Sequence, residues 1–256
     1  MATPSVLILR APGANCDAET QFAFERAGAS AERIHINRLR EQPALLRRFQ
    51  MLVVPGGFTY GDDVAAGKIL ATQLAHFLAD ALREFRDANK LVLGICNGFQ
   101  VLLKAGLLLQ HDDDGPVATL ALNASGKFED RWVHLQVASD KCPFLKGIDR
   151  LELPVAHGEG NFRCREAWIL QGLQQTGQVV LRYVGADGQK GKYPVNPNGS
   201  QDDVAGVCDP TGRVLGLMPH PERHVLPTHH PRWTRTGLAE HGAGFPIFRN
   251  AVQYFS

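Results

Sequence analysis

Residues 91–104, LVLGICNGFQVLLK, contain the feature that most constrains the fold: a cysteine between an apolar run and a helical pattern. The run from Leu91 to Ile95 is typical of a buried strand, and the apolar residues after Cys96 recur at three- and four-residue spacing, which predicts a helix. Gly94 and Gly98 lie two residues on either side of Cys96. This is the pattern of a sharp strand-to-helix turn that carries a nucleophile. The alternative is a buried structural cysteine beside a helix start.

Apolar runs alternate with helical patterns through the first hundred residues, with strand-like runs at 6–9, 33–36, 51–54 and 91–95 and helical patterns at 17–27 and 64–88. This alternation predicts an α/β fold with a parallel sheet covered on both faces, in which ligands collect at the carboxyl ends of the strands. Shorter runs predict further, partly antiparallel strands in the same sheet, at 117–122, 132–137, 151–155, 179–183, 204–208 and 214–218. With a last helix at 245–254, we expect one domain over residues 1–256.

The composition is that of an ordinary globular enzyme or binding protein, with 44% hydrophobic and 21% charged residues. A net charge of +1 favours neither nucleic acid nor an anionic membrane as a partner. No apolar run approaches the roughly 20 residues of a membrane span, and the first residues lack the pattern of a signal peptide. Five cysteines without a C-x-x-C pair indicate reduced thiols, so we expect a cytoplasmic protein.

A nucleophilic thiol needs a base, and the segment VLGLMPHPERH singles out His220 among ten histidines because it follows a predicted strand. Pro221 favours an extended local chain, in which Glu222 points the same way as His220. Cys96, His220 and Glu222 are therefore the candidate nucleophile, base and orienting carboxylate. An isolated His-x-Glu is more often structural than catalytic, so this assignment depends on the fold bringing the histidine to the cysteine.

Acyl chemistry also needs backbone donors for the oxyanion. The residue after such a nucleophile commonly supplies one N–H, here Asn97, and Gly57 in the Pro-Gly-Gly turn is the candidate for the second. An ordinary tight turn is the alternative for that glycine pair. A zinc site around His220, with the nearby His224, His229 and His230, is not favoured, because the segment contains two prolines and no H-E-x-x-H; we expect no metal.

A series of motifs follows in order from Ala11 to Arg223: APGANCD, PGG, GFTYGDD, GICNGFQ, NASGKFEDR, AHGEGNF, YPVNPNGS and VAGVCDPTGRVLGLMPHPER. The series resembles the class I glutamine amidotransferases and, among them, the glutaminase subunits of phosphoribosylformylglycinamidine synthases. The resemblance implies a flavodoxin-like open mixed sheet with helices on both faces. It also implies that Cys96 forms a thioester with glutamine, with His220 as acid and base, Glu222 as its orienter, and Gly57 and Asn97 as oxyanion donors.

The resemblance further implies a glutamine pocket formed by Gln100, Asn123, Ser125 and Phe128. It places residues 157–160, and the turn around Asn198, in loops near the mouth or a partner interface, and His157 is not expected to be catalytic.

The implied activity is hydrolysis of glutamine to glutamate, with ammonia passed to a separate large synthetase subunit that uses ATP and magnesium on formylglycinamide ribonucleotide in purine biosynthesis. Whether a small auxiliary subunit takes part stays open. The chain contains no Walker-type segment, so we expect no cofactor on it.

Two segments depart from the family pattern. Residues 64–66, Val-Ala-Ala, stand where many relatives carry an arginine, and residues 228–244 are extra sequence, a candidate surface insertion. Two other interpretations stay open. One is a stand-alone cysteine hydrolase of the same fold, such as a peptidase or a γ-glutamyl hydrolase, which needs an open cleft and no partner. The other is a non-catalytic module, which has no reason to hold all three candidate catalytic residues.

Overall fold

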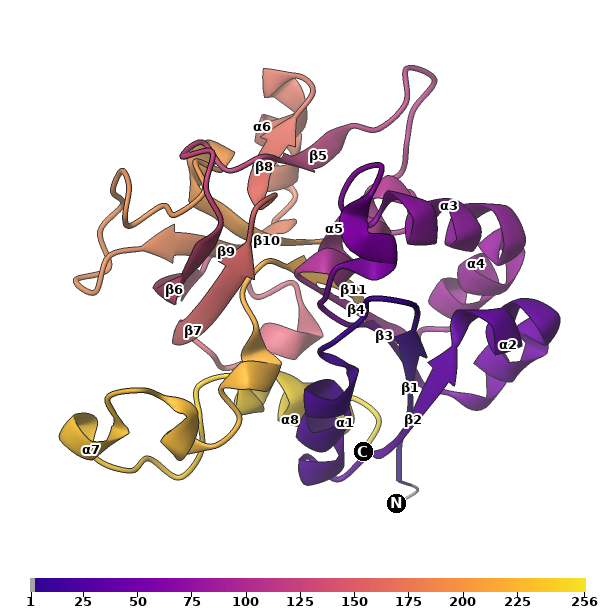
Figure 1. Cartoon of the computed structure of the whole chain (residues 1–256), viewed down its shortest axis with the longest axis horizontal. Coiled ribbons are helices and arrows are strands. Elements are labelled where there is room, and N and C mark those ends of the chain that lie inside the picture. Colours follow the sequence, from indigo (N-terminus) through magenta and orange to yellow (C-terminus); the bar gives the residue numbers. More distant parts are fainter. Residues whose placement is uncertain (1–2) are drawn as a thin grey trace.

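The computed structural model describes residues 3–256 and is built around a nine-stranded mixed sheet (Figure 1). The strand order is β2-β1-β3-β4-β11-β10-β9-β6-β7. These strands are β1 (Ser5–Arg10), β2 (Ser30–His35), β3 (Met51–Val54), β4 (Leu91–Ile95), β6 (Glu129–Val137), β7 (Arg150–His157), β9 (Val179–Val184), β10 (Val204–Cys208) and β11 (Val214–Leu217).

The five strands from β2 to β11 are parallel, and the four beyond them are antiparallel. In the parallel part, Val54 pairs with Gly94, and Ile95 pairs with Leu217. The strands β3, β4 and β11 therefore end side by side, and the residues that follow them emerge at one edge of the sheet. The predicted mixed α/β sheet, with antiparallel strands added in the second half, is confirmed.

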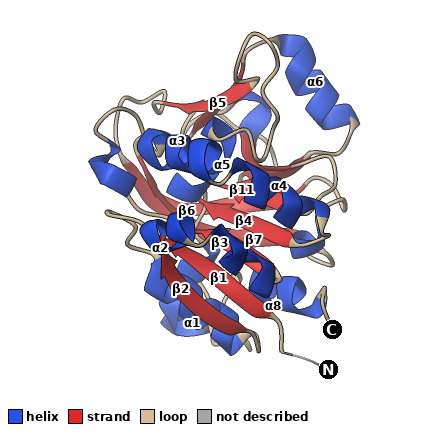
Figure 2. Cartoon of the chain, turned by 90° about the vertical axis from the view of Figure 1, so that its right-hand side faces the viewer, coloured by secondary structure: helices blue, strands red, loops and turns tan. Residues whose placement is uncertain are grey.

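Helices cover both faces of the parallel strands (Figures 1 and 2). In Figure 1, α1 and α8 lie on one side, and α3, α4 and α5 lie on the other. Within residues 3–256, no helix is both long and apolar enough to cross a bilayer. The helices are α1 (Asp17–Arg26), α2 (Ile36–Glu41), α3 (Lys68–Phe77), α4 (Ala79–Asp87), α5 (Asn97–Lys104), α6 (Ala167–Gln175), α7 (Trp233–Thr236) and α8 (Phe245–Gln253).

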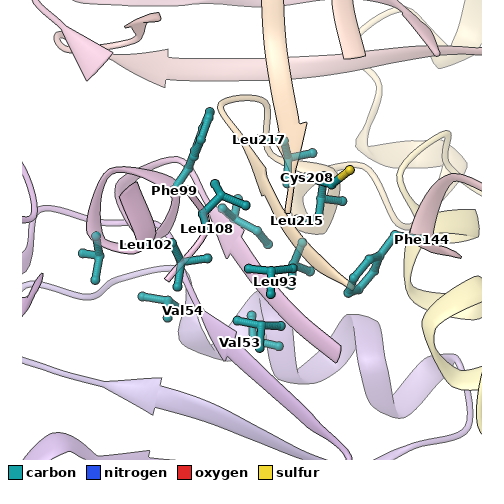
Figure 3. Packing of buried hydrophobic residues seen from close by; sticks show 14 of the residues in the cluster. Val53, Val54, Leu93, Phe99, Leu102, Leu108, Phe144, Cys208, Leu215 and Leu217 are labelled. Atoms are coloured by element: carbon teal, nitrogen blue, oxygen red, sulfur yellow. The ribbon is translucent and has the colours of Figure 1, made fainter. Parts of the chain in front are cut away.

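The core lies between the central strands and the helices on either side (Figure 3). Leu93 and Leu215 occupy its middle, with Phe99 of α5 on one side and Phe144 on the other. All four side chains are at most 1% exposed. Burial of each large apolar side chain contributes about 1.5–3 kcal/mol, so these contacts stabilise the central strands β4 and β11 that carry the turns beyond them.

The strand predicted at 117–122 does not join the main sheet. Instead β5 (Ala118–Ala121) pairs with β8 (Asn161–Cys164) in a separate two-stranded antiparallel sheet. This small sheet lies over α5, where the rings of Phe162 and Phe99 stack with centroids 6.4 Å apart. The β5–β8 sheet is therefore positioned by its packing on α5 and not by pairing with an edge strand of the main sheet.

The single helix predicted over 64–88 is also wrong. Gly67 has a φ of +70°, so α3 begins only at Lys68, and the chain leaves the helical region again at Leu78, where φ is −127°. Leu78 is 1% exposed and lies between two helices that bury separate faces. The predicted strand at 33–36 is instead Ser30–His35, because an edge strand is held by main-chain pairing with β1 and not by an apolar pattern.

Residues 228–244 extend from the main body at the lower left of Figure 1 and include α7. The start of this segment is anchored on β6 and β7. The ring of His230 lies 4.5 Å from that of Trp132, and its Nε2 lies 3.3 Å from Glu152 Oε1. Arg232 donates to the same carboxylate at 3.1 Å.

Gly98 makes a close backbone approach that we expect to be essential for stability. A Cβ at this position would lie 1.8 Å from the carbonyl oxygen of Val54. Gly98→Ala must therefore push α5 away from β3, and we expect it to lower the free energy of unfolding by about 3 kcal/mol, the upper end for overpacking.

Chemical unfolding in urea measures this loss. The matched control is Gly172→Ala in α6, where a Cβ meets nothing within 4 Å and better helix propensity should leave stability unchanged or slightly raised. Equal unfolding midpoints for the two variants would contradict the prediction.

Candidate active site

Cys96 occupies a strained turn between β4 and α5. Its φ of 50° and ψ of −106° lie in a sparsely populated region that costs on the order of 1–3 kcal/mol for a residue with a side chain. The turn is held from both sides: Cys96 N donates to Leu217 O at 2.8 Å, and Phe99 N donates to Cys96 O at 3.0 Å. Strain maintained by such contacts is typical of a functional position, and it confirms the predicted strand-turn-helix geometry at the cysteine.

His220 reaches the same edge of the sheet because it follows β11, the neighbour of β4. Its backbone N donates to Pro154 O of β7 at 2.8 Å, which ties the histidine loop to the antiparallel part of the sheet. The carbonyl oxygen of Ala156, also in β7, lies 3.7 Å from Cys96 Sγ. The cysteine and the histidine therefore both lie where the parallel part of the sheet meets β7 of the antiparallel part.

Glu222 orients the imidazole as expected, but not through an extended chain. Residues Pro221–Arg223 form a 3₁₀ helix (η5), with Pro221 at its first turn. Within it Glu222 turns back, and His220 Nδ1 lies 2.6 Å from Glu222 Oε1. Proline suits the first turn of a helix as well as an extended segment, since its missing N–H has no partner there in any case. His220 and Glu222 are 2% and 1% exposed.

The charge on this pair is set by its surroundings. Burial by itself disfavours a charged imidazole, but the Glu222 carboxylate and the Cys96 sulfur hold the pKa of His220 well above its usual value. His220 Nε2 and Glu222 Oε2 are buried and have no hydrogen-bond partner among the described residues. The site therefore favours a protonated histidine beside the cysteine.

Gly57 and Asn97 are placed for backbone donation on the two sides of the turn. Asn97 is the first residue of α5, so its N–H has no carbonyl one turn earlier to bond, and the helix end favours negative charge. Gly57 has a φ of +145°, which favours glycine, and a Cβ there would lie 2.5 Å from Gly13 O. Their role as oxyanion donors stays a prediction.

The side chains of Asn97 and Gln100 are buried in a network that supports the turn. Asn97 Oδ1 accepts from Thr59 Oγ1 at 2.7 Å, and its Nδ2 donates to Gln100 Oε1 at 2.8 Å. Gln100 Nε2 donates in turn to Glu159 O at 2.6 Å. Gln100 therefore has its amide committed to the chain, and its place in the glutamine pocket stays a prediction.

The other predicted pocket residues do not form one wall. Asn123 is 3% exposed, and its amide holds the loop after β7 by accepting from Gly160 N at 3.0 Å and donating to His157 O at 2.8 Å. Ser125 bonds Glu129 Oε1 at 2.9 Å. Phe128 is 53% exposed, with its ring 6.2 Å from that of Phe58. Ser125 and Phe128 are both exposed, so these two, and not Asn123, are open to contact with another molecule.

His157 is a buried structural histidine. It is 2% exposed, and its Nδ1 lies 3.1 Å from Asn123 Oδ1. Burial, with a smaller effect from His220, lowers the pKa of His157 to about 4. A ring that stays neutral at pH 7 is consistent with the expectation that His157 is not catalytic.

Two residues of the site were not singled out from the sequence. Cys16 belongs to the APGANCD motif and directly precedes α1. Its Sγ lies within 4.8 Å of a ring nitrogen of His220 and of a carboxylate oxygen of Glu222. Arg223 donates to Cys16 Sγ at 3.1 Å. All five cysteines are free and buried, so burial did not distinguish Cys16. The signal in the sequence was its place in a glycine- and proline-containing turn at a strand end.

Known proteins share this architecture over its whole length. A CobB/CobQ-like glutamine amidotransferase domain matches residues 3–255. The chain belongs to this glutamine amidotransferase family. It is 46% identical over 256 residues to a phosphoribosylformylglycinamidine synthase subunit PurQ of Dehalococcoides mccartyi, covering 99% of this chain and 98% of the relative.

Two further relatives agree with this assignment. A PurQ subunit of Methanococcus maripaludis is 39% identical over 267 residues, covering 99% of this chain and 98% of that one. Among solved structures, PurLQS from Thermotoga maritima contains a chain that matches with a TM-score of 0.76 and 30% identity, with both chains covered completely. The expected class I glutamine amidotransferase fold is therefore confirmed.

Within this amidotransferase, Glu222→Gln tests the charge on the histidine. Removing the carboxylate lowers the pKa of His220, so less imidazolium stands beside the Cys96 sulfur at neutral pH to favour its reaction. We expect alkylation of Cys96 by iodoacetamide at pH 7 to slow about tenfold, the equivalent of one pKa unit. The measurement follows the tryptic peptide 91–104 by mass spectrometry.

The other cysteines give that measurement its internal reference. Burial raises the pKa of Cys164 to about 11 and that of Cys208 to about 12, so both react slowly at pH 7. Faster alkylation at all five cysteines in Glu222→Gln would indicate unfolding instead of a local change. An unchanged Cys96 rate in a folded variant would contradict the assigned role of Glu222.

His157 should make the amidotransferase sensitive to acid. Its pKa is about 4 in the fold against 6.5 as the ordinary value, so the unfolded chain binds more protons between these limits. Stability therefore falls as the pH falls, by about 2 kcal/mol between pH 7 and pH 5. His157→Gln should abolish this contribution to the loss of stability between pH 7 and pH 5.

Urea unfolding at the two pH values gives the difference directly. Exposed His76→Gln is the control and should retain the wild-type pH dependence. An identical pH dependence in the wild type and His157→Gln would show that His157 is not held neutral by its burial.

Proposed function

We propose that this chain is the glutaminase subunit of a phosphoribosylformylglycinamidine synthase. The observation that supports it most directly is the thiol at a strained strand-to-helix turn beside a buried His220–Glu222 pair, in a chain matched along its whole length by PurQ subunits. It would hydrolyse glutamine to glutamate and pass the ammonia to a synthetase subunit. That synthetase would use ATP to convert formylglycinamide ribonucleotide to its amidine.

The first half of the reaction forms a thioester. The Cys96 thiolate attacks the carboxamide carbon of glutamine, and the oxygen takes the negative charge between the N–H groups of Gly57 and Asn97. The imidazolium of His220 then gives its proton to the amide nitrogen. The C–N bond breaks, ammonia leaves, and the γ-glutamyl group stays on the sulfur.

The second half regenerates the thiolate. His220, now neutral, takes a proton from a water molecule, whose oxygen attacks the thioester carbon. The C–S bond breaks and the sulfur leaves as the Cys96 thiolate beside the His220 imidazolium, while the new carboxyl group loses the second water proton to solvent and glutamate leaves. Glu222 accepts the Nδ1–H of His220 throughout and so keeps it directed away from the substrate.

A synthetase partner is supported by both chemistry and surface. Ammonia released into water at neutral pH becomes protonated and is no longer a nucleophile, so a shielded route to its acceptor is needed. Beside the Gly57 turn, Phe58 and Phe128 are 45% and 53% exposed, and Val64 is 71% exposed. These apolar side chains are suited to the interface with the synthetase. Val64, the exposed residue of the segment 64–66, then offers the partner an apolar side chain.

A stand-alone cysteine hydrolase is the rival, and it is not favoured by the whole-length likeness to PurQ subunits. The two functions predict different behaviour. A glutaminase subunit should be nearly silent alone and strongly stimulated when docked to a synthetase with its other substrates. A stand-alone hydrolase should turn over equally well without a partner.

Glutamate release from glutamine tests the proposal. The chain is assayed alone, and then with the synthetase subunit, ATP, magnesium and formylglycinamide ribonucleotide. We expect strong stimulation in the complex, and Cys96→Ala should reduce glutamate release about 10⁴-fold or more, since it removes the nucleophile.

Two controls make the result specific. Cys164→Ala removes another buried cysteine and should keep wild-type activity. With ammonium chloride in place of glutamine, the complex containing Cys96→Ala should still form the amidine, because that chemistry belongs to the partner. Glutamate release that survives in Cys96→Ala would overturn the proposal.

A further inference from the structure

Cys16 joins two loops of the site that are far apart in the sequence. Its backbone N donates to Gly56 O at 3.3 Å, so it braces the turn that carries Gly57. Its sulfur accepts a hydrogen bond from Arg223 at 3.1 Å, so it also binds η5, which holds Glu222. Cys16 is 0% exposed. It therefore links the oxyanion turn to the turn of the acid–base pair.

The sulfur of Cys16 is itself fixed in direction. Its S–H donates to Asn15 Oδ1 at 3.2 Å while Arg223 donates to its lone pair. A hydrogen bond from a charged guanidinium is stronger and more directional than one between neutral groups. With both bonds made, the Cys16 side chain cannot rotate without losing one of them in a buried site.

This sulfur lies against the ring of His220. A Cβ built on Gly56 would lie 2.8 Å from His220 Cε1, 3.3 Å from its Nδ1 and 3.3 Å from Cys16 Sγ. The Nδ1–Cε1 edge of the His220 ring and the Cys16 sulfur therefore both pack against Gly56, next to each other. This is the edge that also holds the bond to Glu222, opposite the Nε2 that serves the substrate.

We infer that Cys16 is a positioning residue for His220. Held by Arg223 and Asn15, its sulfur fixes the imidazole edge against the glycine turn and faces the imidazolium with a polarisable lone pair. This inference rests on the proposed function only for its kinetic consequences. The contact itself belongs to the fold.

The electrostatic consequence has a definite sign. Cys16 adds to the interactions that keep the pKa of His220 high, so its removal lowers that pKa. Burial raises the pKa of Cys16 itself, which keeps it a neutral thiol despite the neighbouring histidine and arginine. The titratable and charged groups that face His220 are Cys16, Cys96, His157, Glu222 and Arg223.

The first test needs no substrate. In the full-length chain, Cys16→Ala should slow alkylation of Cys96 by iodoacetamide at pH 7 about three- to tenfold, because less imidazolium stands beside its sulfur to favour the reaction. Cys16→Ser keeps an acceptor for Arg223 and should recover part of the rate. Cys164→Ala is the matched control and should react as wild type.

The second test uses the complex with the synthetase. Cys16→Ala should lower kcat for glutamine hydrolysis about 10- to 100-fold with little change in KM, since a misplaced base affects the chemical step more than binding. The alkaline limb of kcat/KM, which reports loss of the imidazolium proton, should move to lower pH. Arg223→Gln should act in the same direction, and its effect should not add to that of Cys16→Ala.

The results separate this inference from the proposed function. If the wild-type complex releases no glutamate but Cys16→Ala still slows alkylation of Cys96, the glutaminase function fails and the positioning role stands. Wild-type alkylation and an unchanged pH profile in Cys16→Ala overturn the positioning role, even where the melting temperature falls. If Cys16→Ala does not fold, Arg223→Gln decides by the same two measurements.

Discussion

The parallel pairing of β3, β4 and β11 is the constraint on which the site depends. Because these strands end in register, the Pro-Gly-Gly turn, the Cys96 turn and the His220 loop emerge from one edge of the sheet. None of these segments is near another in the sequence. Their distances are set by the spacing between strands, and the apolar contacts of Leu93 and Leu215 hold that spacing rigid. A site built on strand ends is therefore more precise than one built on mobile loops.

Close packing at this edge leaves little freedom for the reacting groups. Gly98 lies so near Val54 that α5 starts directly against the sheet, which directs its positive end at the Cys96 sulfur. The buried pair of His220 and Glu222 costs desolvation energy, and such a pair persists where it has a task beyond stability. Here the task is to hold a proton next to a thiol. The strain at Cys96 and the buried charge therefore meet at one place, where a protonated histidine stands beside the sulfur.

The buried polar groups around the site form a support for it. The amide side chains of this support form hydrogen bonds to other parts of the chain: those of Asn97, Gln100 and Asn123. These bonds hold three neighbouring loops in one arrangement. Cys16 does the same for the turns of Gly57 and Glu222. The exposed Phe128 and its neighbours lie outside this support, where a partner can cover them. Of the residues that were expected to line the pocket, Gln100 and Asn123 are thus buried in this support, and Ser125 and Phe128 are exposed.

The sequence by itself determined the α/β alternation, the strained turn at Cys96 and the identity of His220 and Glu222, because apolar periodicity, flanking glycines and close spacing are local signals. It misjudged the chain around Pro221 and the long helix at 64–88, where a proline or an apolar pattern suits two conformations and packing selects one. Only the tertiary structure showed that Cys16 and Arg223 belong to the site. Their contact spans 207 residues of sequence, and a distance of that kind is set by strand order and register, which no local pattern contains.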